Sequence, residues 1–414
     1  MLSALSGIPT QIFKLLQEIG DTAHQPTYVV GGVVRDLYLQ RENLDLDIVV
    51  EGDAIRLAHR LAEKWSAELQ SHHQFGTATV TRPDRLKIDF VTARNETYEQ
   101  SGALPLVRQG TIGEDLQRRD FSINALAIYL NPDDFGKMVD CTDGLEDLRH
   151  GRVRALHEQS FNDDPTRIFR AIRYEQRYGF RIVERDETLI REAIGRGDLE
   201  SVSGQRIRNE IDRILIEEDT PRTVQRMLEF DLFRAIQPHW NVTPDFAAQW
   251  SLTQQAMDWT VEYLPTDETD TEAVRWMALL DTVDVIETVS DRLVLENQLR
   301  KKFIATVELL NNLDALSTDA KPSEIYQLLK PYPLEALVFA LVQPNQPDWR
   351  AKKIAHYLIN LRHVQPLING DDLIQLGLKP SEAFVSLLWR AFSAQLDEKI
   401  GTKQEAYQFL GYKI

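Results

Sequence analysis

The chain has 414 residues, of which 43% are hydrophobic, so it has material for a sizeable core and for about two to four domains. Its formal net charge of −17 argues against an evenly spread affinity for nucleic acid, although a phosphate partner responds to local patches and not to the total. A single cysteine, Cys141, excludes an internal disulfide framework and a cysteine metal site, and the longest apolar runs are too short to span a membrane. We therefore expect a soluble, cytoplasmic protein.

The predicted elements divide the chain into a mixed part and a helical part. Four short strands are predicted at residues 28–30, 46–50, 77–81 and 86–92. A helix is predicted at residues 54–65. Beyond Asp164 helical spacing dominates, and helices are predicted at residues 167–178, 206–217, 223–230, 293–310 and 351–361. The pattern predicts an α+β N-terminal head followed by an all-α remainder, with loops at residues 265–271 and 317–322.

The first chemically informative run is Tyr28 to Val50, where a glycine pair follows one predicted strand and an Asp-x-Asp falls on the next. Gly31 and Gly32 lack side chains, so a phosphate can approach the backbone there. Asp45 and Asp47, two apart on the predicted strand, point to the same face, as two ligands of a divalent metal would. Paired aspartates beside a turn are also common in solvated loops, so this motif alone leaves both interpretations open.

A third carboxylate lies between Lys87 and Val91, where alternation places Asp89 opposite the face formed by Ile88 and Phe90. On a neighbouring strand it could complete a metal site or deprotonate a hydroxyl group. An ordinary surface aspartate explains the pattern equally well, and the spacing does not decide between the two.

An arginine pair follows in the run DLQRRDFSINALA. Arg118 and Arg119 precede an apolar segment that we expect to be helical, so that Asp120 and Asn124 would share one face. Guanidinium groups offer planar paired donors to a triphosphate, and Asn124 could bind a ribose hydroxyl. Taken alone, such a run is more often a solvated charge cluster.

A stripe of arginines follows in DDPTRIFRAIRYEQRYGFR. An aspartate before Pro165 suits the start of a helix, on which the arginines then recur every three or four residues: Arg167, Arg170, Arg173 and Arg177. Four guanidinium groups on one face repel one another. They need anionic partners, which are either acidic side chains or the phosphates of a nucleotide or RNA.

These motifs occur in the order YVVGGVVRD, LDLDIVVEGDA, RRDFSINALA, DCTDGLEDLRHGRVR and DDPTRIFRAIRY. In this the chain resembles the class II tRNA nucleotidyltransferases, a family of CCA-adding enzymes and bacterial poly(A) polymerases. The resemblance covers residues 25–235. It implies a polymerase β-like head that holds the metal ions, followed by helical neck, body and tail domains that bind tRNA. The expected domains are residues 1–145, 146–210, 211–315 and 316–414.

The resemblance also implies roles for single residues. Asp45 and Asp47 resemble the Mg²⁺ ligands. The implied triphosphate contacts are Gly32, Arg35 and Arg119. The segment with Asp120 and Asn124 resembles the one that meets the ribose.

The implied base-reading pair is Asp164 and Arg167, with Arg170 and Arg173 behind it. Two positions depart from the family pattern, because Asp163 and Gln205 each replace a glutamate near this pair or in the motif that braces it. Cytosine and adenine present an amino donor beside a ring-nitrogen acceptor, and uracil and guanine present the opposite order. A carboxylate beside a guanidinium complements only the first order, so the pair would accept CTP and ATP without a template.

The expected activity is Mg²⁺-dependent transfer of CMP and AMP to the 3′ end of tRNA, which builds or repairs the CCA terminus and releases pyrophosphate. The alternatives are addition of A alone or CC alone, then a poly(A) polymerase, then a non-catalytic RNA-binding protein. The GALP run at residues 102–105 favours the A-adding branch, whereas the turn-rich stretch 94–113 suits a pocket that adjusts for full CCA addition. Basic clusters at residues 300–302 and 350–356 are candidate tRNA contacts.

Overall fold

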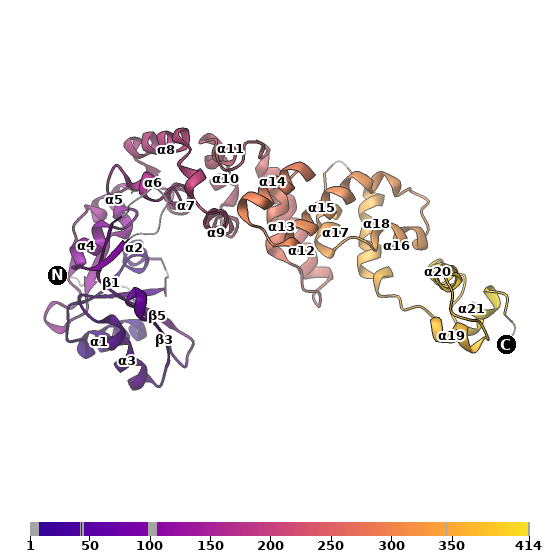
Figure 1. Cartoon of the computed structure of the whole chain (residues 1–414), viewed down its shortest axis with the longest axis horizontal. Coiled ribbons are helices and arrows are strands. Elements are labelled where there is room, and N and C mark those ends of the chain that lie inside the picture. The colour runs from indigo at the N-terminus through magenta and orange to yellow at the C-terminus, as the bar shows by residue number, and fades with distance from the viewer. Residues whose placement is uncertain (1–7, 42, 44, 98–105, 345, 413–414) are drawn as a thin grey trace. The chain divides into compact units, whose positions relative to one another are not determined.

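The computed structural model describes residues 8–41, 43, 45–97, 106–344 and 346–412. The chain divides into two compact units, Met1–Ile236 and Gln237–Ile414. Figure 1 labels strands only in the early, indigo part of the chain, whereas the orange and yellow part carries helices. Within the described residues, no helix combines the length and the apolar character needed to cross a membrane.

A seven-stranded sheet forms the head, in the order β3-β4-β5-β2-β1-β8-β9. Its strands are β1 (Thr27–Val30), β2 (Leu46–Val50), β3 (Glu68–His72), β4 (Thr77–Thr81), β5 (Lys87–Thr92), β8 (Leu126–Tyr129) and β9 (Met138–Asp140). β2 and β5 run parallel, and the other neighbours are antiparallel. The central strands carry almost continuous apolar runs because both faces of the sheet are covered there.

Helices of the first unit cover the sheet and continue beyond it. α3 (Ala54–Trp65) packs on β3, β4 and β5 through an apolar stripe, and the Asp53 side chain caps its first turn. The remaining helices are α1 (Thr10–Thr22), α2 (Gly32–Tyr38), α4 (Ile112–Gln117), α5 (Gly144–His150), α6 (Ser160–Asp163), α7 (Arg167–Tyr178), α8 (Glu184–Arg196), α9 (Gly204–Leu215), α10 (Thr220–Glu229) and α11 (Leu232–Ile236). Two short ribbons complete the unit, β6 (Arg94–Thr97) with β7 (Leu106–Gln109) and β10 (Arg152–Val153) with β11 (Arg181–Ile182).

Several sequence predictions are confirmed, because β2, β4, α3 and α7 have the predicted bounds. The predicted helix after Arg119 is wrong. A 3₁₀ turn (Ser122–Asn124) leads there into β8, which pairs with the central strand β1, and a short apolar run cannot distinguish a strand from a helix. Asp45 lies just before β2 and not within it. The centre of the stretch 94–113, including the GALP run, lies outside the described residues.

The second unit is helical throughout its described residues. Its helices are α12 (Phe246–Tyr263), α13 (Thr271–Trp276), α14 (Val283–Leu293), α15 (Asn297–Asn312), α16 (Pro322–Leu329), α17 (Leu334–Leu341), α18 (Asp348–Ile359), α19 (Gly370–Gln375), α20 (Ala383–Leu396) and α21 (Lys403–Phe409). The predicted helix at residues 293–310 is wrong at its start, because α14 ends where Val294 takes a left-handed conformation (φ 55°). Neither glycine nor proline marks that break.

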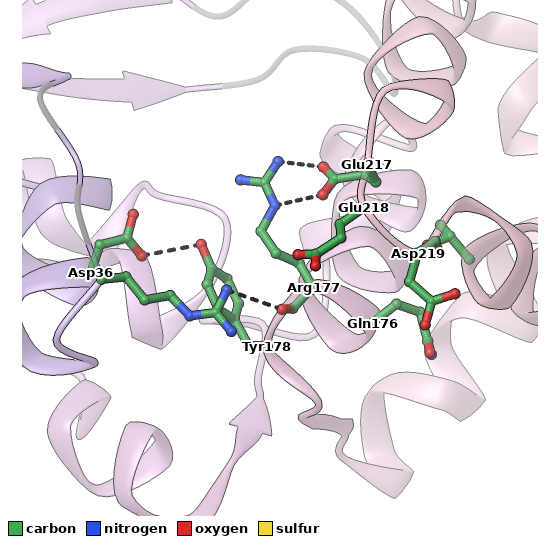
Figure 2. Close-up of a pocket in the computed structure, with 9 residues that line it drawn as sticks. Asp36, Gln176, Arg177, Tyr178, Glu217, Glu218 and Asp219 are labelled. Carbon is green, nitrogen blue, oxygen red and sulfur yellow. Dashed lines mark hydrogen bonds and ion pairs between the residues drawn. The ribbon is translucent and has the colours of Figure 1, made fainter. Parts of the chain in front are cut away.

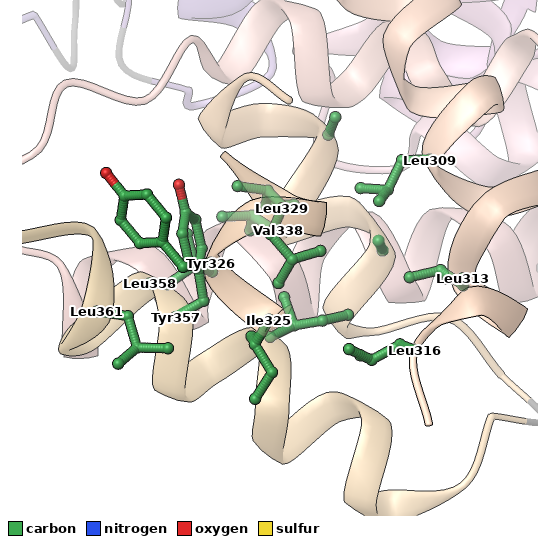
Figure 3. Close-up of a cluster of buried hydrophobic side chains, with 14 of the residues drawn as sticks. Leu309, Leu313, Leu316, Ile325, Tyr326, Leu329, Val338, Tyr357, Leu358 and Leu361 are labelled. Atoms are coloured by element: carbon green, nitrogen blue, oxygen red, sulfur yellow. The ribbon is translucent and has the colours of Figure 1, made fainter. Parts of the chain in front are cut away.

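The core of the second unit joins side chains from α15 to α18, among them Leu309, Ile325, Tyr326, Val338 and Leu358 (Figure 3). The predicted boundary between residues 315 and 316 falls among the segments that build this core, and the boundary between residues 210 and 211 falls inside α9. The boundary between the two compact units follows Ile236, and the four-part division of the chain stays a prediction.

Candidate active site

One cavity of about 330 Å³ in the first unit gathers most of the predicted site residues. Its walls come from the turn between β1 and α2, the start of β2, the segment around the 3₁₀ turn, and α7. The lining residues are almost all polar: Gly31, Gly32, Arg35, Asp36, Asn43, Asp45, Asp47, Arg119, Asp120, Asn124, Arg170, Arg173, Tyr174 and Arg177. The predicted residues Asp89, Asp164 and Arg167 do not line it.

The glycine turn requires glycine at its first position. Gly31 has φ 75° and ψ −131°, a conformation open only to a residue without Cβ, and its N–H donates to the Leu126 carbonyl at 3.1 Å. A Cβ atom on Gly31 would lie 2.8 Å from Nη1 of Arg119 and 3.8 Å from Oδ2 of Asp47. The turn therefore brings bare backbone against both the arginine and the carboxylate.

Asp47 and Asp89 are register partners on the parallel strands β2 and β5, so their side chains lie on one face of the sheet. Asp89 accepts a hydrogen bond from Oγ1 of Thr79 at 2.5 Å. This bond joins Asp89 to the neighbouring strand β4, and Asp89 does not line the cavity. Asp45 precedes β2 and is exposed, and it lines the cavity together with Asp47.

Burial raises the pKa of Asp47 to about 6; Arg119 opposes this rise, whereas Asp45, Asp89 and Asp115 add to it. Arginines and aspartates nearly balance in the cavity lining, so the demand for a cation is local to Asp47, whose neighbours Asp45 and Asp89 are also acidic. Within the described residues, no group of three or more His, Cys, Asp or Glu is placed to hold a metal ion. One or two carboxylates together with substrate phosphates are the usual ligands of Mg²⁺, and Asp45 and Asp47 fit that pattern.

Arg119 is fixed from behind by a residue that the sequence analysis did not single out. Asp115, which is fully buried, accepts from Nη2 of Arg119 at 3.1 Å and from Nη2 of Arg118 at 2.6 Å. Its spacing of four residues before Arg119, which follows the end of α4, was the available signal. Nε of Arg119 is buried without a hydrogen-bond partner, so the guanidinium retains capacity for an anion.

Arg35 lies at the cavity but already has several partners. Its Nε and Nη2 donate to Asp36 at 2.8 and 2.9 Å, and its Nη1 donates to Oδ1 of Asn124. The guanidinium also stacks on the rings of Tyr174 and Tyr178, with centroid distances of 5.2 and 4.7 Å. Asp36 and the two tyrosines were not predicted as site residues, because their contacts join segments far apart in the sequence.

Asp120 and Asn124 meet as expected, although on a 3₁₀ turn and not on a helix face. Nδ2 of Asn124 donates to Oδ1 of Asp120 at 3.0 Å. Both residues are buried in the cavity wall. Asp120 also binds Arg170 of α7, fifty positions later in the chain, with Nε at 2.8 Å.

The predicted base-reading residues bond to different partners. Asp164 accepts from Oγ1 of Thr166 at 2.6 Å and from Nη2 of Arg206 at 2.8 Å. Arg167 donates to Oγ of Ser160 at 2.7 Å and to the Arg118 carbonyl at 3.3 Å. The residues are linked through their backbones, by a bond of 3.0 Å from the Arg167 N–H to the Asp164 carbonyl.

Acidic side chains partner the rest of the arginine stripe. Arg173 lies 3.7 Å from Glu210 and 3.6 Å from Glu217, and Arg177 pairs with Glu217. Glu210 lies on α9 and Glu217 just after it. The sequence analysis predicted a helix there but did not predict that these glutamates pair with the arginines of α7. The sequence analysis offered acidic side chains or phosphates as partners for these arginines. For Arg173 and Arg177 the structure shows acidic side chains of the same chain.

A second cavity, of about 620 Å³, adjoins the first and shares Asp36 and Arg177 with it. Figure 2 shows the hydroxyl of Tyr178 facing Asp36, a bond of 3.2 Å, and Arg177 facing Glu217. Glu218 and Asp219 line its far side. The sequence analysis did not predict this cavity.

Comparison with known proteins decides the family. A profile described as "Poly A polymerase head domain" matches residues 27–154, and one described as "Probable RNA and SrmB- binding site of polymerase A" matches residues 179–243. An A-adding tRNA nucleotidyltransferase from Halalkalibacterium halodurans is 32% identical over 96% of this chain and 91% of that protein. The chain belongs to the tRNA nucleotidyltransferase family. The resemblance drawn from the sequence motifs is confirmed.

Other members of the tRNA nucleotidyltransferase family differ in length. An A-adding enzyme from Geobacter sulfurreducens is 34% identical over 94% of this chain but only 45% of its own length, so the chain spans about half of that relative. Among solved structures, the apo form II of a CCA-adding enzyme matches with a TM-score of 0.83, 34% identity and coverage of 98% and 96%. The Thermotoga maritima CCA-adding enzyme complexed with tRNA matches with a TM-score of 0.75, 32% identity and the same coverage. The α+β head and helical remainder are thus confirmed as well.

Proposed function

We propose that this protein transfers CMP and AMP from CTP and ATP to the 3′ end of tRNA, without a template and with release of pyrophosphate. The observation that carries the proposal is the cavity in which the glycine turn, Asp45, Asp47 and Arg119 of the head face the arginines of α7. Relatives named tRNA nucleotidyltransferases support the substrate class. We propose the cytoplasm as the compartment, in keeping with a chain whose one cysteine forms no disulfide.

Carboxylates and cationic or backbone groups of the cavity have different roles in the proposed reaction. Asp45 and Asp47 would hold Mg²⁺, which supplies neutralisation of the triphosphate and a lowered pKa for the attacking hydroxyl. Arg119 donates to triphosphate oxygens, and the bare backbone at Gly31 admits the phosphates. The terminal hydroxyl of tRNA attacks the α-phosphorus in line, a new phosphodiester bond forms, and the bond to the β-phosphate oxygen breaks.

Base selection is assigned to Asp164 and Arg167. The carboxylate of Asp164 accepts from the exocyclic amino group of cytosine or adenine, and Arg167 donates to the neighbouring ring nitrogen. Arg167 must give up a bond to Ser160 or Arg118 to do so. Arg206 holds Asp164 in place for either base.

Addition of the terminal A alone is the second candidate. One specific observation favours it: of four relatives that match over more than nine-tenths of this chain, the two at 34% and 32% identity are named A-adding, whereas two at 26% identity are named CCA-adding and CC-adding. The proposal of full CCA addition requires that the same cavity binds CTP and ATP in turn.

Three tRNA transcripts distinguish the candidates. They end at the discriminator base, after C and after CC, and each is incubated with CTP, ATP or both. A full CCA enzyme extends all three to the same length when both nucleotides are present. An A-adding enzyme extends only the CC-ending transcript, and a CC-adding enzyme stops two nucleotides past the discriminator. Long A tails would indicate a poly(A) polymerase, and the absence of any incorporation would refute the proposed function.

Asp47→Asn tests the assignment of Asp47 to the metal site. The change keeps the shape of the side chain and removes its charge, so we expect incorporation to fall below detection. Because burial and like charges already disfavour the ionised carboxylate, we expect thermal stability to be maintained. Retention of tRNA in a filter-binding assay should also persist. Near-normal turnover of Asp47→Asn in Mg²⁺ would remove Asp47 from the metal site.

A further inference from the structure

One serine contacts both residues that are proposed to read the base. Ser160 begins the short helix α6, which packs against α7 and α8. Its carbonyl accepts from the Asp164 N–H at 3.2 Å, and its hydroxyl accepts from Nη1 of Arg167 at 2.7 Å. Ser160 is fully buried, so water does not compete for either bond. The serine therefore sets where Asp164 and Arg167 lie relative to each other.

Arg167 is a buried cation with neutral partners. It is 5% exposed, yet in the described part of the chain no ion pair joins it to a carboxylate. Its guanidinium donates to two neutral oxygens, the Ser160 hydroxyl and the Arg118 carbonyl. A guanidinium group has more donors than these two bonds use. Because a buried cation is costly unless its donors are satisfied, the remaining donors indicate a place for an acceptor that a ligand supplies.

The acidic residue beside Asp164 does not hold Arg167. Asp163 stands where the family pattern has glutamate, and its carboxylate lies 3.8 Å from Nε2 of His157. Among the residues that the structure describes, no hydrogen bond or ion pair joins Asp163 to Arg167. The hydroxyl of Ser160 is thus the side-chain group that fixes this guanidinium.

The two hydrogen bonds of the Arg167 guanidinium differ in length. The bond from Nη2 to the Arg118 carbonyl is 3.3 Å, which is longer than usual for N–H···O, whereas the bond from Nη1 to Ser160 is 2.7 Å. A base that offers a ring-nitrogen acceptor would therefore take Nη2 from the Arg118 carbonyl and leave Nη1 on Ser160. The guanidinium group would then turn about one fixed bond.

We infer that Ser160 is a positioning residue for base selection, whose hydroxyl anchors Nη1 of Arg167 so that Nη2 is presented to the incoming base. The inference rests on the proposed function, in which Asp164 and Arg167 read CTP and ATP. Uracil and guanine carry an N–H at the corresponding ring position, and an anchored donor cannot accept from it. Without the anchor, the guanidinium can turn away from such a base, and the discrimination against it falls.

Ser160→Ala tests the inference on the full chain, with a CC-ending tRNA and either ATP or GTP. These purine nucleotides share a ring system but present the opposite order of donor and acceptor. We expect kcat/KM for GTP to rise roughly tenfold relative to that for ATP, because the lost bond is one to a charged group. An unchanged preference for ATP over GTP, with or without a loss of rate, overturns the inference.

Ser160→Thr is the conservative variant, because threonine retains a hydroxyl oxygen. It should recover the normal preference for ATP over GTP, although the added methyl group should lower the melting temperature. Ser160→Cys places a weaker acceptor of similar size there and keeps the test open if threonine does not fit. Its preference should lie between those of the unaltered enzyme and Ser160→Ala. A folded Ser160→Thr that discriminates as poorly as Ser160→Ala contradicts the inference.

Phe161→Leu is the matched control, since Phe161 is the next residue of α6 and is 1% exposed. It should lower the melting temperature through lost packing and leave the preference for ATP over GTP unchanged. A shift as large as that of Ser160→Ala would mean that loosening of α6 changes base choice, and would overturn the inference.

The unaltered enzyme, run in parallel, separates this inference from the proposed function. Its failure to incorporate any nucleotide would refute the proposed function. An active enzyme whose Ser160→Ala variant keeps the normal preference would refute only the role of Ser160. If the enzyme adds CC alone, CTP and UTP on the transcript that ends at the discriminator base provide the equivalent pair.

Discussion

Arg206 holds the carboxylate of Asp164 from the first turn of α9, at 2.8 Å. Its neighbour Gln205 points away, is exposed, and donates to Asn209 within the same helix. The family motif placed the brace at position 205, where this chain has glutamine in place of glutamate. In the structure the adjacent cation, Arg206, supplies the charge-assisted bond to Asp164.

Arg206→Gln is therefore expected to loosen base selection. A hydrogen bond to a charged group at a partly exposed site contributes about 1 kcal/mol, so UTP and GTP should gain roughly five- to tenfold relative to CTP and ATP. Steady-state kinetics with all four nucleotides measure the change. Gln205→Ala is the control and should retain the normal order of preference. A uniform loss of rate in Arg206→Gln would show that Arg206 has only a structural role.

At the scale of single residues, the sequence identified which side chains belong to the site better than it identified which side chains they contact. Spacing along a helix exposes neighbours three or four residues apart, as with Asp115 and Arg119. It cannot show that Asp120 meets Arg170, because that contact depends on how the head packs on α7. Motif resemblance implied a ribose contact for the Asp120 segment and a place behind the base-reading pair for Arg170; that both line one cavity is a finding of the structure.

At the scale of helices and strands, an element was predicted correctly where its pattern of apolar residues was clear. β2 was predicted with its observed bounds because its run is almost entirely apolar, and α3 because its apolar residues recur at helical spacing. β8 was mistaken for a helix, since four apolar residues fit either period. The edge strand β3 was missed because its alternation of exposed and half-buried polar residues carries little apolar signal.

Two glycines at helix ends allow a matched comparison. Gly31 precedes α2 with φ 75° and ψ −131°, and Gly179 ends α7 with φ 66° and ψ 30°. Gly179→Ala should cost about 1 kcal/mol of unfolding free energy, because a Cβ there meets nothing within 4 Å. Gly31→Ala should cost up to about 3 kcal/mol.

Only Gly31→Ala should also impair catalysis, because its Cβ would lie 2.8 Å from Nη1 of Arg119. We expect kcat/KM for ATP to fall by more than about tenfold, the loss of one charge-assisted contact to the triphosphate. Denaturant unfolding and kinetics on both variants provide the measurements. Equal kinetic losses in the two would mean that backbone strain, and not the displacement of Arg119, is responsible.

At the scale of the whole molecule, most basic residues proposed to contact tRNA are occupied within the second unit. Lys302 pairs with Asp270 and Glu335, Arg350 with Asp314, and Arg300 with acidic residues of α14. Lys301 and Lys352 are exposed, and in the described part of the chain no ion pair engages them. These two lysines are the better candidates for phosphate contacts.

The double variant Lys301→Gln with Lys352→Gln should bind tRNA more weakly and with less dependence on salt. Each lost phosphate contact lowers the slope of log affinity against log salt by about 0.7 to 0.9. Binding titrations between low and moderate salt measure that slope. Lys302→Gln is the control and should reduce stability while leaving the slope unchanged. An unaltered slope in the double variant would exclude both lysines as phosphate contacts.

The placement of β1 inside the head sheet, between β2 and β8, has a consequence for the order in which the sheet can form. The Thr27 N–H bonds to Asn131, 104 residues further on, and β1 has only one neighbour until β8 is available. On the ribosome, Asp47 is therefore synthesised long before β1 gains its second neighbour, and the cavity is complete only once α7 has been made. A nascent chain that stops before α7 possesses Asp45 and Asp47 but lacks the wall that α7 contributes to the cavity. We therefore expect catalytic activity only after the head and α7 have both been translated, so that truncated products carry the carboxylates but are inactive.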